Sequence, residues 1–271
     1  MLFKEIKNIL EKRLSPKKYL INGENYGLQY GQANNEKNIK RILLTVDLNF
    51  ESIHFAILNK VNLIISYNRL ITYPIRKFNN LLIKKLTLLS KYPILIFPLN
   101  SALIAAEGGI SDTIMEILYL QLDKVLDIKH KNKNIIPVGR ICSPKLYSES
   151  SNHITLENLL KRIKSNFMVD SLSFVGDLKS EVKKICIVGS EIKNSQYLKK
   201  AYKDDCDCFI SSTINSELAR LAKDFEMKLI IIPIYSILNI TLKRLTHYLS
   251  LEFPYDEFLY FEVKEPIKIY N

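Results

Sequence analysis

The chain has 271 residues, of which 47% are hydrophobic and 25% charged, and this composition excludes a disordered or fibrous protein. It is long enough for two modest domains or one large one. Lysine and arginine exceed aspartate and glutamate by 39 to 28, so the net charge is +11 and anionic partners are favoured. No apolar stretch approaches the roughly 20 residues of a membrane-spanning helix, and the N-terminus lacks the apolar run of a signal peptide. We therefore expect a cytoplasmic protein with no membrane partner.

The first part of the chain alternates between helical and strand-like patterns. Apolar residues at helical spacing from Leu2 to Leu10 predict a helix that ends at Ser15 and Pro16. Buried strands are predicted over 42–46, 61–65 and 94–97, and helices over 51–58 and 81–89. Another helix follows Ser111, which we expect to cap it, with Asp112 in the first turn.

The second part repeats this alternation after a polar stretch at residues 143–152. Helices are predicted over 156–163, 194–202, 217–225 and 240–249, and strands over 185–188, 208–211 and 229–232. The sequence thus predicts an α/β protein with two similar α/β lobes and mostly parallel mixed sheets. We place the lobes at residues 1–130 and 131–271, and the last helix and strand can pack back on the first lobe. Ligand clefts are expected at the carboxyl ends of the strands.

Several short motifs lie at these strand ends. Residues 25–31 read Asn-Tyr-Gly-Leu-Gln-Tyr-Gly, and Asp47 follows the first strand. The second strand continues into Ser-Tyr-Asn-Arg-Leu at 66–70, and residues 105–112 read Ala-Ala-Glu-Gly-Gly-Ile-Ser-Asp. The remaining blocks are 73–78, 138–140, 184–190 and 229–238. In this order, over nearly the whole chain, they resemble the Nif-three-like family (GTP cyclohydrolase I type 2 homologues), and in particular its short archaeal type.

The resemblance implies a site for two divalent metals that this sequence no longer supports. Family members are understood to hold the metals with two adjacent histidines, an aspartate, and a later histidine and glutamate. Those five positions are occupied here by Tyr67, Asn68, Ile104, Ile234 and Leu238. Aliphatic side chains offer no lone pair, and neutral phenol and amide groups are poor substitutes for imidazole and carboxylate. We therefore expect no metal cofactor and no metal-activated water.

Other reactive residues do not form a replacement site. The four histidines, His54, His130, His153 and His247, do not follow predicted strands, where ligands would converge. The cysteines Cys142, Cys186, Cys206 and Cys208 are interpreted as reduced structural thiols, since Cys206 and Cys208 lack the second pair of a zinc site. The turn at Gly189 and Ser190 lacks the glycine-rich pattern of a nucleotide loop, and we interpret it as structural.

Three functions remain open. The first is a non-catalytic family member, a binding or assembly module, and this makes an enzyme the less favoured reading. The second is a factor that binds RNA or a ribonucleoprotein through its positive charge, although a coding bias toward lysine would produce the same charge. The third is a metal-dependent hydrolase acting on a nucleotide or a phosphorylated small molecule. The polar groups expected near the cleft are Asn25, Asp47, Tyr67, Asn68, Asn100, Glu107, Arg140 and Tyr235. The resemblance also implies a homo-oligomer, a hexameric ring.

Overall fold

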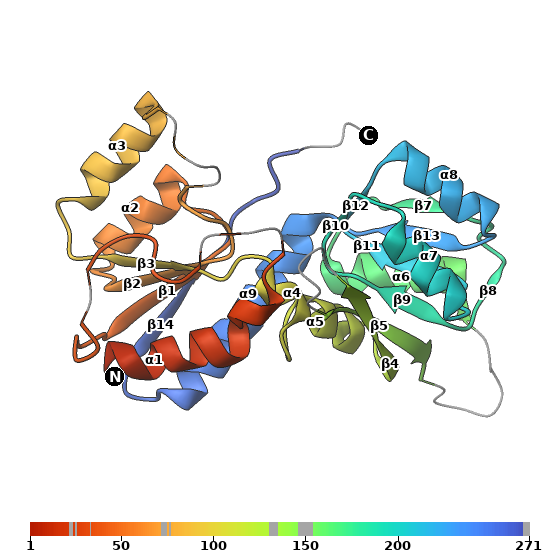
Figure 1. Cartoon of the computed structure of the whole chain (residues 1–271), viewed down its shortest axis with the longest axis horizontal. Helices are drawn as coiled ribbons and strands as arrows, with labels where there is room; N and C mark the ends of the chain where they lie inside the picture. Colours follow the sequence, from red (N-terminus) through yellow and green to blue (C-terminus); the bar gives the residue numbers. More distant parts are fainter. Residues whose placement is uncertain are drawn as a thin grey trace. The chain divides into compact units, whose positions relative to one another are not determined.

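The protein divides into two compact units. The computed structural model describes residues 1–21, 24, 26–32, 34–71, 75, 77–129, 135–145 and 154–267. Unit 1 consists of Met1–Leu103 and Thr241–Asn271, and unit 2 of Ile104–Ile240. Both units are α/β structures (Figure 1).

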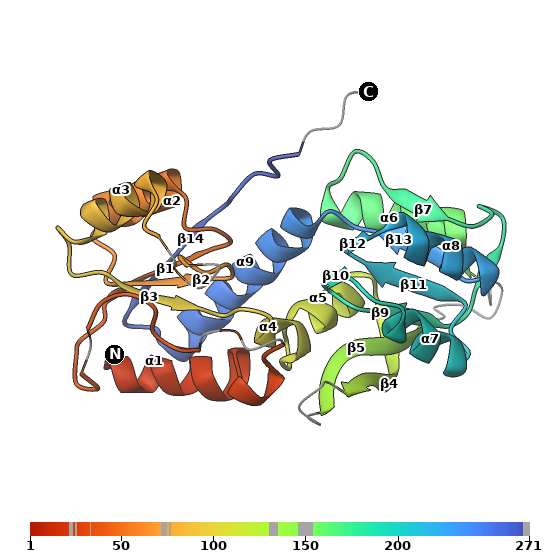
Figure 2. The same cartoon turned by 45° about the horizontal axis from the view of Figure 1, so that its top comes forward.

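Unit 1 is built on a parallel four-stranded sheet in the order β14-β1-β2-β3. The strands are β1 (Arg41–Thr45), β2 (Leu63–Ser66), β3 (Leu95–Pro98) and β14 (Glu257–Phe261). Parallel neighbours need crossover connections, which α2 (Phe50–Leu58) and α3 (Asn80–Leu89) supply. These two helices lie on one face of the sheet, and α1 (Phe3–Ile9) lies on the other with the part of α9 (Ile234–Glu252) that belongs to unit 1 (Figures 1 and 2).

The core of unit 1 explains its sequence pattern. Ile42, Leu43 and Leu44 are all buried, because helices cover both faces of the sheet. One core cluster joins Leu43, Ile64 and Ile96 of the strands to residues of α2 and α3. The side chains of Asn49 and Asn79 cap α2 and α3 by accepting hydrogen bonds from the backbone of Ser52 and Leu82, each at 2.8 Å. Beyond α1 the chain forms a π-helical turn at Leu10–Leu14 and a 3-10 turn at Lys17–Tyr19.

Unit 2 contains a mixed six-stranded sheet in the order β4-β5-β9-β11-β13-β7. The strands are β4 (Leu120–Lys129), β5 (Ile135–Pro144), β7 (Ser173–Val175), β9 (Ile185–Ile187), β11 (Cys208–Ser211) and β13 (Lys228–Ile231). The central strands β9, β11 and β13 are parallel, whereas β4, β5 and β7 are joined by antiparallel pairing. Two small sheets pair β6 (Ile154–Thr155) with β8 (Glu181–Val182), and β10 (Glu191–Ile192) with β12 (Thr213–Ile214). The helices of this unit are α5 (Ile110–Ile117), α6 (Leu156–Phe167), α7 (Gln196–Lys203) and α8 (Ser216–Asp224), and the short α4 (Ala102–Ala105) lies at the unit boundary.

The α/β class and the helices and strands predicted from the sequence are confirmed, with several corrections. Ser111 does not cap α5, because the N-cap is Gly109 and Ser111 lies inside the helix. There its hydroxyl donates to the carbonyl of Val138 at 2.8 Å. The hairpin of β4 and β5 was not predicted, and α9 begins six residues earlier than expected. The division proposed between residues 130 and 131 separates the two strands of this hairpin, whereas the compact units divide after Leu103 and after Ile240.

Neither a membrane span nor a disulfide is found in the described structure. No described helix is long and apolar enough to cross a membrane. All four cysteines are described, free and buried. Burial is the main cause that raises the pKa of the Cys142 thiol to about 12.

Candidate binding cleft

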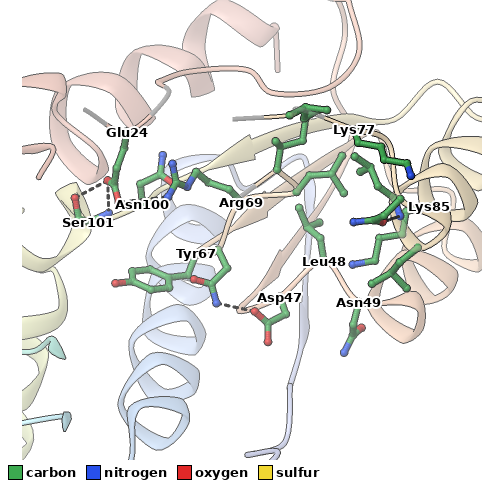
Figure 3. A pocket seen from close by; sticks show the side chains of 17 residues that line it. Glu24, Asp47, Leu48, Asn49, Tyr67, Arg69, Lys77, Lys85, Asn100 and Ser101 are labelled. Atoms are coloured by element: carbon green, nitrogen blue, oxygen red, sulfur yellow. Dashed lines mark hydrogen bonds and ion pairs between the residues drawn. The ribbon is translucent and has the colours of Figure 1, made fainter. Parts of the chain in front are cut away.

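A cleft of about 1150 Å³ opens in unit 1 where three neighbouring strands end (Figure 3). Asp47 follows β1, Tyr67 and Asn68 follow β2, and Asn100 follows β3, and all four side chains line it. The remaining lining residues come from the loops after these strands, from α3 and from Glu24. The cleft therefore lies where open parallel sheets commonly bind ligands.

Backbone hydrogen bonds extend the sheet into the cleft and fix these side chains. The amide of Tyr67 donates to Thr45 at 3.0 Å, and the amide of Asn68 donates to Val46 at 2.9 Å. The amide of Asn100 donates to Tyr67 at 3.1 Å. Asn100 is buried and has a φ of +57°, a left-handed conformation that asparagine adopts more readily than most residues.

The segment at residues 26–31, from the motif singled out in the sequence, frames this cleft. Gln29 accepts a hydrogen bond from the amide of Leu70 at 2.7 Å through its side chain, and its own amide donates to Ile96 at 2.8 Å. Gly31 has a φ of +84°, and a Cβ there would lie 2.8 Å from the carbonyl oxygen of Ile94. The segment thus holds β3 to the loop after β2. Asn25, predicted near the cleft, lies outside the described residues.

One end of the cleft holds a carboxylate whose charge is already matched. Glu24 accepts hydrogen bonds from the hydroxyl of Ser101 at 2.6 Å and from its amide at 3.2 Å. Arg69 approaches the other carboxylate oxygen at 4.0 Å, and both side chains of this ion pair are about one-fifth exposed. The sequence did not identify Glu24, because it lies on no strand end and in no motif.

The opposite end of the cleft carries two ammonium groups, those of Lys77 and Lys85 (Figure 3). Within the described part of the chain, neither forms an ion pair with a carboxylate. Burial lowers the pKa of Lys85, and the negative charge of Asp47 partly opposes this shift. The sequence did not single out these lysines either, although helical periodicity places Lys85 on a different face of α3 from the exposed Lys84.

The centre of the cleft contains a hydrogen bond between an amide and a carboxylate. The Nδ2 group of Asn68 donates to Oδ1 of Asp47 at 2.6 Å. Beside it, burial raises the pKa of the Tyr67 phenol, and the negative charge of Glu24 raises it further. Tyr67 is therefore a neutral phenol at physiological pH.

The donor groups at the five positions singled out in the sequence do not fit a dinuclear metal centre. In unit 1, the Tyr67 phenol keeps its proton and the Asn68 amide donates to Asp47. In unit 2, Ile104 and Leu238 are 3% and 1% exposed, and Ile234 is half-buried. Searching the described ranges for three or more His, Cys, Asp or Glu side chains that could share a metal ion finds none. Of the histidines, His130 and His153 lie outside those ranges.

The other residues expected near the cleft belong to unit 2. Glu107 is exposed, and Tyr235 is half-buried at the start of α9. Arg140 is 5% exposed and forms a bidentate ion pair with Asp112, so its guanidinium is engaged inside the unit. At the turn predicted to be structural, the amide of Gly189 donates to the hydroxyl of Ser111 at 3.2 Å.

Fold and site together define a two-unit α/β protein with a polar cleft at the carboxyl ends of a parallel sheet. The sequence matches the family described as Duf34/NIF3 (NGG1p interacting factor 3) over residues 1–266, and the chain belongs to this family. A GTP cyclohydrolase 1 type 2 homolog of Clostridium perfringens is 30% identical over 193 residues, which are 69% of this chain and 69% of that protein. A protein of the same description from Clostridium acetobutylicum is 24% identical and is matched over 77% of this chain and 74% of its own length.

Solved structures agree with the fold. A Bacillus cereus protein related to NIF3 superposes with a TM-score of 0.80 at 14% identity, over 100% of this chain and 99% of the other. A hypothetical protein of Staphylococcus aureus gives a TM-score of 0.81 at 19% identity with the same coverage. The predicted Nif-three-like fold is therefore confirmed.

Proposed function

We propose that this chain is a non-catalytic Duf34/NIF3 protein that has lost the dinuclear metal site and acts as a binding module through the unit 1 cleft. The observation that carries the proposal is the hydrogen bond from Asn68 to Asp47. An amide that donates to this carboxylate stands at a position where the family resemblance implies a histidine. The cleft has thereby become a hydrogen-bonded polar surface.

The chemistry of the side chains supports this proposal over a hydrolase. Metal-assisted hydrolysis requires an ion that polarises the substrate or lowers the pKa of a bound water. Imidazole and carboxylate groups would have to hold that ion, and of these the described lining residues offer only Asp47 and Glu24. Glu24 is engaged by Ser101 and Arg69, and the neutral phenol of Tyr67 is a weak ligand.

A general base or nucleophile that works without metal also finds little support in the cleft. Its serine, Ser101, hydrogen-bonds to Glu24 and also accepts a hydrogen bond from the amide of Ile21 at 2.9 Å. Among the described residues that line the cleft there is no histidine to activate this hydroxyl. The hydroxyl therefore serves to hold the carboxylate of Glu24.

Metal analysis of the purified full-length chain tests the proposal. After exposure to zinc, manganese and ferrous ions followed by gel filtration, we expect far less than one metal ion per chain. One or two ions per chain in wild type that are lost in Asp47→Asn would place a metal in the cleft and refute the proposal. Cys206→Ser is the matched control, because zinc held by that thiol would fall with it and not with Asp47→Asn.

A further inference from the structure

We propose that the unit 1 cleft binds a small organic anion whose charged group lies between Lys77 and Lys85 and whose apolar body covers Ile75 and Leu81. This inference deepens the proposed binding function, because it names the class of ligand. The ligand has an anionic group attached to an apolar body, and the anionic group can be a phosphate or a carboxylate.

Charge is unequally distributed along the cleft. At one end, Glu24 is matched by Arg69 and by two hydrogen bonds from Ser101. At the other end, Lys77 and Lys85 have no carboxylate partner among the residues that the structure describes. Positive charge is therefore in excess at one end only, and a ligand anion would be drawn there.

The side chain of Lys85 is partly buried. Removing an ammonium group from water without an ion pair disfavours its charged form, and the pKa of Lys85 is lowered accordingly. The centroid of the Phe50 ring lies 5.9 Å from the Lys85 nitrogen, which is at the limit of a cation–π contact. An anion bound beside Lys85 would restore the lost electrostatic stabilisation, and it would gain a stronger interaction than at a fully solvated lysine.

Apolar side chains line the cleft beside the two lysines. Ile75 and Leu81 line the cleft yet remain 41% and 57% exposed, and Leu82 lines it next to them. Ligand sites typically combine such apolar surface with a few polar groups that fix orientation. At about 1150 Å³, the cleft has room for an organic molecule well beyond the size of a bare inorganic ion.

The shape of the site favours a small molecule over a macromolecule. Lys77, Lys85 and the acidic end all face one concave space enclosed by the strand ends, the following loops and α3 (Figure 3). By contrast, Lys84 lies in a separate shallow groove between α2 and α3, together with His54 and Lys91. This arrangement makes Lys84 a matched control on the same helix.

Phenyl phosphate, benzoate and the neutral benzyl alcohol are suitable probes, with binding to the full-length chain measured by isothermal titration calorimetry and ligand-observed NMR. We expect the wild type to bind at least one of the two anions with a Kd below about 10 mM and to bind benzyl alcohol more weakly. Lys85→Met and Lys77→Met should each raise that Kd about tenfold or more, whereas Lys84→Met should change it less than about twofold. Whichever anion binds more tightly identifies the charged group.

A second variant separates the two parts of the site. Leu81→Gln should weaken phenyl phosphate and leave inorganic phosphate unchanged, because only the former has an apolar body. The proposal is overturned if neither organic anion binds, if Lys84→Met weakens binding as much as Lys85→Met, or if benzyl alcohol binds as well as the anions. Circular dichroism of each variant shows whether it is folded.

The outcome is distinguishable from failure of the proposed function. Lysine-dependent anion binding by a chain that also holds a metal lost in Asp47→Asn would support this inference and refute the loss of the metal site. A metal-free chain that binds no organic anion would support the loss of the metal site and refute the anion site.

Discussion

The ion pair between Asp112 and Arg140 decides whether Arg140 is a structural residue or a group available to a ligand. One guanidinium nitrogen donates to Asp112 at 2.9 Å, and the Nε group donates to the other carboxylate oxygen. Arg140 also donates to the carbonyls of Pro137 and Gly139, and Asp112 accepts from the amide of Gly108. Arg140 and Asp112 are 5% and 8% exposed. The pair thus joins α5 to β5 with nearly all of its polar groups satisfied.

Arg140→Met would leave a buried carboxylate with a single backbone donor. Breaking a buried ion pair in this way costs about 3–5 kcal/mol, a large part of the roughly 5–15 kcal/mol that stabilises a typical domain. The matched control is Lys183→Met in the same unit, because Lys183 pairs with Glu181 at 3.3 Å with both side chains about half or more exposed. Removing that exposed pair should cost less than about 1 kcal/mol.

Urea denaturation followed by circular dichroism measures both losses. Asp112→Leu/Arg140→Met provides a further check, since replacing both partners by apolar groups should recover part of the loss caused by Arg140→Met alone. The reasoning is refuted if Arg140→Met is no more destabilising than Lys183→Met. Because the Arg140 guanidinium is engaged by Asp112 within unit 2, Arg140→Met should also leave the Kd for phenyl phosphate unchanged wherever the variant remains folded.

Three further predictions concern the glycines at residues 26–31, the loss of stability at alkaline pH, and oligomeric assembly. Gly31→Ala should lower the free energy of unfolding in urea by about 2–4 kcal/mol, because its Cβ would add a close contact with Ile94 to the strain of a left-handed φ. Gly27→Ala is the control and should lose about 1 kcal/mol, because Gly27 has a φ of +85° but no atom within 4 Å of the added Cβ. Equal losses in the two variants would contradict this. Burial raises the pKa of Cys142 from 9.0 to about 12, so the stability that its neutral thiol contributes is complete below about pH 9 and is lost as the pH rises toward 12. The melting temperature of Cys142→Ala should therefore fall less steeply than that of the wild type over this pH range. We propose a hexamer, which light scattering after gel filtration would show as about six times 31.5 kDa, and a monomeric mass would argue against it.

Local patterns predicted the individual elements of the fold but not the pairing between them. Short apolar runs such as Ile42–Leu44 identify buried strands because both faces of the sheet are covered. The β4–β5 hairpin escaped prediction because β4 is largely exposed along the middle of its length and carries register shifts, so it has neither a continuous apolar run nor a clean alternation. Ser111 was expected to cap α5 because a serine before an apolar run is a common start signal, but its hydroxyl serves Val138 and Gly189 instead.

The cleft could be predicted in position but only partly in composition. Strand ends located Asp47, Tyr67, Asn68 and Asn100, because the topology of a parallel sheet brings them to one edge. Lys85 lies on a helix and Glu24 in no predicted element, so their positions in the cleft depend on tertiary packing that no local pattern encodes. Identifying the basic end therefore required the structure.

Under the proposed function the metal ligands are lost while the cleft persists, and these two features are physically separable. The shape of the cleft depends on contacts to the backbone by residues 26–31. The side chain of Gln29 accepts a hydrogen bond from the amide of Leu70, and Gly31 lets this segment approach β3 closely. Backbone hydrogen bonds also hold Asn68 and Asn100 at the rim, and the left-handed φ of Asn100 suits an asparagine. Substituting ligands at the rim thus need not disturb the frame, and Asn68 can pair with Asp47 while the lysines of the opposite wall stay available. The backbone contacts that shape the cleft would therefore preserve it as a binding site without a metal. The anion titrations on the Lys85 and Lys84 variants test that conclusion directly.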